Sequence, residues 1–276
     1  MKIKYLGTSA AEGIPTIGCS CPMCQKARAQ RGRYIRTRSQ ALVNEDLMLD
    51  FNADAHLHLL HHDINMQAVD SILITHPHWD HFVPRELLLL RPKFSTTQRK
   101  KPWTVCGGSS VIEQVSDMSQ ESLPWLQTRE LTAFHPVQIG NYVVCALEAA
   151  HGTGLEDGYF IYAIGQADKQ LLYCHDTDGF TESVWQYFAE TKPRFDLISL
   201  DCTRGNETDL YQGHMNIEKC KLLRQRLQEE GYADNDTIFV LNHFSHNGVS
   251  ADYDEMCQVA EPQGFVVSYD GLEIEI

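Results

Sequence analysis

Short apolar runs that end directly in a histidine or an aspartate recur along this chain. Runs of about four to six residues rich in Ile, Leu, Val and Phe are typical of buried β-strands. They end at or beside His76, His151, Asp176, Asp201 and His243. Polar side chains at the ends of neighbouring strands would gather along one edge of a sheet. The pattern therefore predicts an α/β fold that collects these groups in one place.

Helical stretches separate the predicted strands. In "NIEKCKLLRQRLQEEG" the apolar residues share one face, Asn216 can cap the start and Gly231 can end the helix. The stretch "VPRELLLLRPKF" also reads as helical. Residues 1–276 are therefore interpreted as a single α/β domain with two halves, divided near residue 130.

The composition of 43% hydrophobic and 22% charged residues is ordinary for a soluble globular protein. No apolar run approaches the length of a membrane span, and the N-terminus lacks the apolar core of a secretory signal. We therefore expect a cytoplasmic protein with reduced cysteines and no membrane partner. A net charge of −14 repels long polyanions, so a nucleic-acid polymer is not expected as a partner. The densest basic run, "QRKK" at 98–101, is interpreted as a solvated loop.

The motif "THPHWDH" places four residues with metal-binding side chains within six positions: His76, His78, Asp80 and His81. Imidazole nitrogen suits Zn, Mn, Fe, Co and Ni, and a carboxylate suits a second, more oxygen-rich position. In a turn after a strand, this spacing lets the first two histidines face one metal and the last two residues face another. A polar loop with surface histidines is the alternative interpretation, and the density of the motif favours a metal site.

A site with two metals needs further ligands, and other strand ends can supply them. An aspartate between two cations can bridge them, so Asp176 is predicted to serve both. The first set is His76, His78, His151 and Asp176; the second is Asp80, His81, Asp176 and His243. His175 competes with Asp176, but neighbouring strand residues point to opposite faces.

These residues carry a family resemblance. The pattern His-x-His-x-Asp-His followed by distant His, Asp and His resembles the metallo-β-lactamase superfamily over essentially the whole chain. "YLGTSAAEGIP", the Cys-x-Cys-x2-Cys loop, "GHMN" and "NHFSH" are most similar to phosphodiesterases of the PhnP type, which act on phosphoribosyl cyclic phosphate. The resemblance implies a four-layer αββα sandwich with two divalent metals, Zn or Mn, at one edge of the sheets.

Two such cations lower the pKa of a water held between them and offset the charge of a phosphate. The expected reaction is therefore in-line attack of a metal-bridging hydroxide on a small phosphate ester, cyclic or open. His214 is the candidate that protonates or stabilises the leaving alkoxide, because it lies in a Gly-containing loop before a helix. The resemblance also places a non-ligand histidine there. His214 and the ligand Asp80 are the predicted catalytic residues; a helix-capping or exposed histidine is the alternative for His214.

Several other polar residues have two interpretations. Arg204, after Thr203 at a strand end, either grips a phosphate or is an exposed loop arginine. Asp50 either orients a metal-bound histidine or is structural. His58 and His62, four apart in "HLHLLHHD", are interpreted as an exposed helical face rather than a metal site.

Trp79 and residues 84–130 depart from the family pattern. Trp79 either walls the pocket or packs beneath it. Because substrate selection often depends on such segments, the substrate stays open. The alternatives are a lactonase or thioesterase on the same scaffold, and an accessory protein related to pyrroloquinoline quinone assembly. The family also suggests a homodimer.

The loop "GCSCPMC" holds Cys19, Cys21 and Cys24 within six positions. Its spacing is not that of a redox pair, and the odd total of nine cysteines argues against a disulfide framework. A tetrahedral Zn with three thiolates and one histidine fits the loop and leaves no position for water. Spacing alone does not identify the fourth ligand; the resemblance pairs His246 with this loop. The predicted site is structural, with free cysteines as the alternative.

Overall fold

Two mixed β-sheets form the centre of the computed structural model, which describes residues 1–118, 123–151, 158–208, 212–247 and 252–276. The first sheet has the order β14 (Glu273–Glu275), β1 (Lys2–Gly7), β2 (Gln40–Val43), β3 (Leu47–Leu49), β4 (Ser71–Leu73), β5 (Trp103–Gly107), β6 (Leu126–Glu130). The second has the order β13 (Phe265–Val267), β12 (Ile238–Asn242), β11 (Leu197–Asp201), β10 (Lys169–Cys174), β9 (Phe160–Gln166), β8 (Tyr142–Glu148), β7 (Val137–Ile139).

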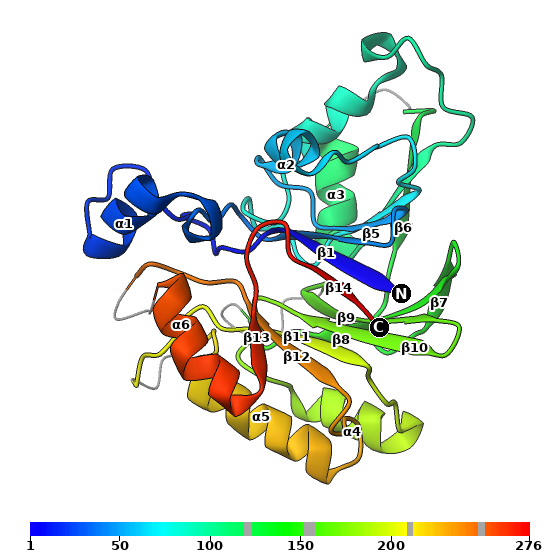
Figure 1. The fold of residues 1–276 in the computed structure, drawn as a ribbon. Helices are drawn as coiled ribbons and strands as arrows, with labels where there is room; N and C mark the ends of the chain where they lie inside the picture. The colour runs from blue at the N-terminus through cyan, green and yellow to red at the C-terminus, as the bar shows by residue number, and fades with distance from the viewer. Residues whose placement is uncertain (119–122, 152–157, 209–211, 248–251) are drawn as a thin grey trace.

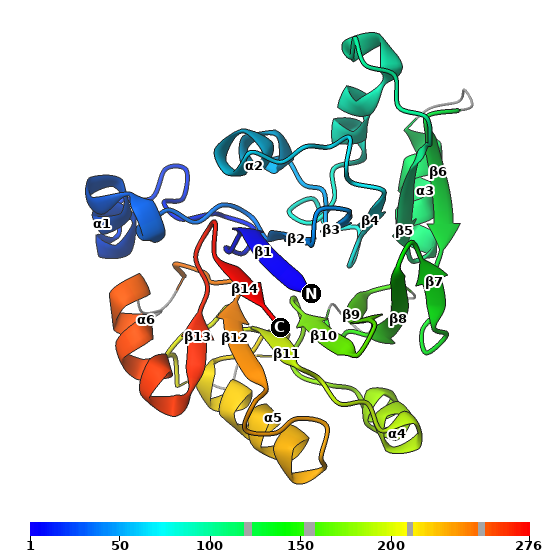
Figure 2. The same cartoon turned by 45° about the vertical axis from the view of Figure 1, so that its right-hand side comes forward.

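Helices cover the outer face of each sheet (Figures 1 and 2). The first sheet carries α2 (Ala55–His62) and α3 (Ser109–Asp117), and the second carries α4 (Glu182–Thr191), α5 (Ile217–Glu229) and α6 (Tyr253–Ala260). A further helix, α1 (Pro22–Gln30), lies at one end of the sandwich. The predicted four-layer αββα sandwich is therefore confirmed.

The strand residues alternate between two apolar cores, as the two-residue period of a strand requires. Leu171 packs between the sheets, whereas its neighbour Leu172 packs against the helices of the second sheet. Leu73 likewise faces the space between the sheets and Ile72 faces the helices of the first. Strands buried on both faces explain the continuous apolar runs of the sequence.

The chain passes from the first sheet to the second between β6 and β7, close to the division predicted near residue 130. The last strand, β14, returns to the first sheet and pairs with β1. The two ends of the chain consequently meet, with the Met1 nitrogen 2.9 Å from the Ile276 carbonyl oxygen.

The predicted helix after "GHMN" is α5. Its capping residue Asn216 accepts a hydrogen bond from the Lys219 N–H at 2.9 Å, and Gly231 follows its end with a φ of 81°. The other helical stretch consists of two short 3-10 helices, η2 (Pro84–Leu90) and η3 (Pro92–Phe94). Within the described ranges, no helix is long and apolar enough to cross a membrane.

Candidate metal centre

The strand ends that the sequence singled out meet at one edge of the sandwich. Strands β10, β11 and β12 are parallel, and β8 runs in the same direction because both it and β10 are antiparallel to β9. Their carboxyl ends therefore lie at the same edge. Asp50, Asp176 and His243 follow β3, β10 and β12 with φ values of 65°, 55° and 64°. This left-handed backbone is costly for residues other than glycine and often marks functional positions.

The first predicted ligand set forms one cluster: His76, His78, His151 and Asp176, with ligand atoms all within 4.8 Å of one another. His76 Nε2 lies 3.1 Å from Asp176 Oδ2 and 3.0 Å from His78 Nδ1. His151 Nε2 lies 3.3 Å from His78 Nδ1. The structure therefore brings these four side chains together.

The second predicted set forms an adjoining cluster: Asp80, His81, Asp176 and His243. His81 Nε2 lies 3.2 Å from both His243 Nε2 and Asp176 Oδ2, and 3.6 Å from Asp80 Oδ2. Asp176 belongs to both clusters, as the predicted bridging residue should, and it is buried.

The hydrogen bonds of His81 and His243 test whether these residues fit a cation. His81 Nδ1 lies 2.7 Å from Asp50 Oδ2, and His243 Nδ1 lies 2.7 Å from Thr203 Oγ1. If each Nδ1–H donates to its partner, both Nε2 lone pairs face one another across 3.2 Å. Two facing lone pairs repel unless a proton or a metal cation lies between them. The imidazole and carboxylate groups of the two clusters thus fit divalent metals that accept such ligands.

Asp176 supports the same conclusion. Its buried Oδ1 accepts no hydrogen bond within the described part of the chain, although His214 Nδ1 lies 3.2 Å away, so this oxygen can still serve as a ligand. Burial alone opposes its charge, but the imidazoles of His243, His76 and His81 outweigh burial and hold its pKa well below the usual value. The aspartate therefore stays ionised.

Asp50 orients the second cluster, the role that sequence left open beside a structural one. It is fully buried, and its Oδ1 accepts hydrogen bonds from the Thr75 N–H at 2.8 Å and the Thr75 hydroxyl at 2.9 Å. Its other oxygen faces His81. Burial disfavours a charged His81, yet Asp50 and Asp80 outweigh it and raise the pKa of His81 well above its ordinary value.

Asp201 organises the region around His214, a role that the sequence did not assign. Its Oδ2 lies 3.0 Å from His214 Nδ1, and its Oδ1 accepts from the Thr203 and Met215 N–H groups at 3.0 and 3.2 Å. Burial lowers the pKa of His214, but the Asp201 carboxylate outweighs it and raises that pKa to about 9. A further cluster groups Asp201 with three other residues: Asp176, His214 and His243. In the sequence, the only signal for Asp201 was its position at the end of a predicted strand.

A cavity of about 410 Å³ opens over the two clusters and is lined by Trp79, Arg204 and His214, among others. Trp79 is 57% exposed, so it walls the cavity rather than packing beneath it. The guanidinium of Arg204 pairs with Glu207, although the residue still lines the cavity. Arg204 is thus partly buried rather than an exposed loop arginine.

The other candidate histidines lie outside the centre. His175 faces away from the ligands, with Nε2 2.7 Å from Ser199 Oγ and Nδ1 3.2 Å from Ser39 Oγ, as strand alternation predicted. The prediction of an exposed helical face is wrong for His58, which is 1% exposed and hydrogen-bonded to Gln40 Oε1 at 2.6 Å. A Cβ at Gly7 would lie 2.0 Å from the Arg38 carbonyl oxygen and 2.9 Å from His58 Cε1, so the glycine leaves room for both.

The cysteine loop forms a separate cluster: Cys19, Cys21, Cys24 and His246, with ligand atoms within 4.8 Å of one another. His246 Nδ1 lies 3.6 Å from both Cys19 Sγ and Cys21 Sγ. All nine cysteines are free of disulfides. Three thiols and one imidazole are a donor set that suits a closed tetrahedral zinc site.

The sequence profile described as "Beta-lactamase superfamily domain" matches residues 47–243. A new diphosphatase from the PhnP family has a similar structure, with a TM-score of 0.76 and 17% identity over 100% of this chain and 97% of that one. Zn²⁺-bound PqqB from Methylobacterium extorquens has a TM-score of 0.73 and 18% identity over 100% of both chains. Human tRNase Z, short form, has a TM-score of 0.65 and 16% identity over 100% of this chain and 99% of that one.

A curated octanoyltransferase from Porphyromonas gingivalis is 31% identical to this chain over 85 residues. Those residues are 29% of this chain and 16% of that protein. The chain therefore spans only a small part of this relative.

Proposed function

Because this chain belongs to the beta-lactamase superfamily, whose fold implies divalent metals and hydrolase chemistry, we propose that it is a metal-dependent phosphodiesterase. Its substrate is a small phosphate ester, cyclic or open. When bound, two divalent cations supply an activated water and offset the phosphate charge. His76, His78, His151 and Asp176 would hold one cation, and Asp80, His81, Asp176 and His243 the other.

The position of His214 carries the proposal. Its ring centroid lies 5.3 Å from that of His151 and 5.8 Å from that of His243, so it borders both ligand clusters. Asp201 holds its Nδ1, which leaves Nε2 available to the cavity that His214 lines. An imidazole in this position protonates the departing alkoxide of a phosphodiester. A thioester, whose thiolate leaves without a proton, has less need of such a group, whereas the alkoxide of a lactone also needs one.

The cavity supports a small substrate. A volume of about 410 Å³ lies in the range of small-molecule sites, and the chain has a net charge of −14. A polymeric nucleic acid needs an extended basic surface to follow its backbone. The complete ligand sets favour catalysis over a carrier role in cofactor assembly, the function class that the PqqB likeness raises.

A substrate panel tests the proposal. Protein loaded with Mn or Zn would be offered bis(p-nitrophenyl) phosphate, cyclic nucleotides, phosphoribosyl cyclic phosphate, a lactone and a thioester. We expect turnover of at least one phosphodiester and none of the carbonyl esters. Turnover of the lactone or thioester alone, or of nothing at full metal occupancy, would contradict the proposal.

A further inference from the structure

A second pocket lies on the helix side of the first sheet and shares no lining residue with the cavity over the metal clusters. Its volume is about 470 Å³, and its walls come from α2, η2 and η3, with Trp103 of β5 also lining it. This size falls within the range of small-molecule sites, which are mostly apolar. The proposed phosphodiesterase reaction makes no use of it.

The rim of this apolar pocket is also apolar. Leu60 is 70% exposed, Leu89 is 51% exposed and Phe94 is 61% exposed, and all three line the pocket. A single exposed leucine is ordinary, but several around one cavity indicate a site that binds apolar groups. Glu86, in the first turn of η2, is the only carboxylate among the lining residues.

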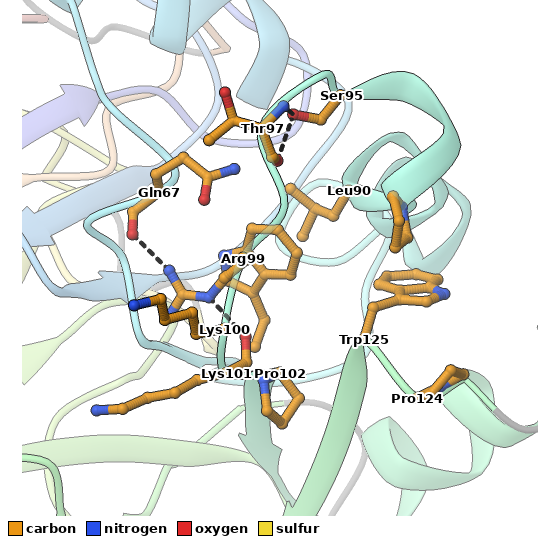
Figure 3. A pocket seen from close by; sticks show the side chains of 12 residues that line it. Gln67, Leu90, Ser95, Thr97, Arg99, Lys100, Lys101, Pro102, Pro124 and Trp125 are labelled. Atoms are coloured by element: carbon orange, nitrogen blue, oxygen red, sulfur yellow. Dashed lines mark hydrogen bonds between the residues drawn. The ribbon is translucent and has the colours of Figure 1, made fainter.

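A basic pocket of about 200 Å³ adjoins the apolar one. The two share four lining residues: Gln67, Leu90, Ser95 and Trp103. Figure 3 shows Arg99, Lys100 and Lys101 on one side of the basic pocket and Trp125 on the other. Gln98, Lys100 and Lys101 are exposed, as expected, but Arg99 is partly buried and the run borders a pocket instead of lying free in a loop.

The charges of this basic run differ in how they are used. Arg99 pairs with Asp70 and lies 4.8 Å from the centroid of the Trp103 ring. Lys100 and Lys101 form no ion pair with any residue that the structure describes. Two unpaired lysines beside an apolar pocket, on a chain of net charge −14, make a local site for an anion.

We propose that the joined pockets bind a small amphipathic anion. An unbranched acyl chain occupies the apolar pocket, and its anionic head lies beside Lys100 and Lys101. The apolar walls exclude a purely polar ligand, and the lysines favour an anion over a neutral alcohol of the same length. This site is independent of the metals, so it holds whether or not the proposed phosphodiesterase activity does.

A chain-length series tests the site directly. A change in tryptophan emission would report binding of octanoate, decanoate and dodecanoate, each below its micelle concentration, because Trp103 and Trp125 line the basic pocket. If each methylene is buried, affinity should rise about fourfold per carbon. Decyl phosphate should bind as decanoate does, and decanol more weakly. A flat series, or equal affinity for decanol and decanoate, would overturn the proposal.

Matched variants locate the binding. Leu60→Gln should weaken decanoate binding, whereas Leu222→Gln, at a leucine 67% exposed on α5, should not. Lys100→Glu with Lys101→Glu should weaken it about fivefold. Lys192→Glu with Lys221→Glu makes the same change in net charge elsewhere and should leave it unaltered.

The controls also separate the other occupants. Equal effects of the pocket variants and their controls would mean that the carboxylate binds elsewhere, including at the metal centre. Binding to anionic vesicles without any binding of the monomeric anions would assign the surface to a membrane. Either result would overturn the proposal.

Discussion

Asp176 is the residue on which both halves of the candidate centre depend. Its Oδ2 lies 3.1 Å from His76 Nε2 and 3.2 Å from His81 Nε2, so one oxygen faces both clusters. Its φ of 55° turns the chain immediately after β10 and separates its side chain from that of His175. Local strain at this position is thus offset by what the carboxylate gathers around it.

His214 gives the first prediction at this scale. His214→Ala should lower phosphodiester turnover by about 10²- to 10⁴-fold, because a proton donor to the leaving group is lost. Both metals should stay bound, which elemental analysis checks. His135→Ala, at an exposed histidine outside the centre, is the control. Full activity of His214→Ala would rule out the assigned role.

His58 gives a prediction about pH. Burial lowers its pKa from 6.5 to about 3, so below pH 6.5 the unfolded chain binds a proton that the folded chain does not. Stability from this group should therefore be lost as the pH falls, by about 1.4 kcal/mol per pH unit.

His58→Gln should remove that slope. Between pH 7 and pH 5, wild-type protein should lose about 2 kcal/mol more unfolding free energy than the variant, measured by denaturant titration. The metal ligands titrate in both proteins, so the difference isolates His58. Parallel curves would show that His58 is not a buried neutral histidine.

At the scale of elements, the cysteine loop lies beside the segment that follows β12. The cysteine loop and the start of α1 face the segment after β12, which carries both His243 and His246. Cys21 also caps α1 by accepting a hydrogen bond from the Cys24 N–H. The loop therefore lies against the segment that carries both histidines and does not line the cavity over the metal clusters.

Cys21→Ser should therefore remove one zinc per chain and lower the unfolding free energy by more than about 2 kcal/mol. Activity should fall only as a consequence of that loss. Cys257→Ser, in α6 and outside the cluster, should keep the zinc. Lost activity with unchanged zinc content and melting temperature would show that the cysteine loop acts in catalysis instead.

The N-terminal caps of α5 and α4 can be compared, because each accepts a hydrogen bond from a backbone N–H of its own helix. Asn216 accepts from the Lys219 N–H at 2.9 Å, and Thr181 accepts from the Val184 N–H at 3.3 Å. Replacing either with Ala should cost about 1 kcal/mol of unfolding free energy. Of the two variants, only Asn216→Ala should reduce turnover, because Asn216 lies two residues from His214 in the chain. Equal turnover in the two variants would show that the cap does not position His214.

At the scale of the molecule, two sheets bring distant segments of the chain to one edge. The apolar runs predicted strands, and the structure brings the residues of the His-x-His-x-Asp-His motif together with the distant residues at strand ends. His58 and the "QRKK" run were misjudged in part. His58, on α2, lies against β1, and the "QRKK" run lies near η3 and β5. No local sequence pattern encodes such contacts. Asp201 was seen as a strand end, but its hold on His214 depends on how the loop folds back.

Metal titration of the chelator-stripped protein tests the central claim most directly. We expect phosphodiester turnover to rise as metal is added and to reach its maximum near three metals per chain: two at the centre and one at the cysteine cluster. Maximal turnover at one metal per chain, or no turnover at three, would contradict a reaction that depends on two metals.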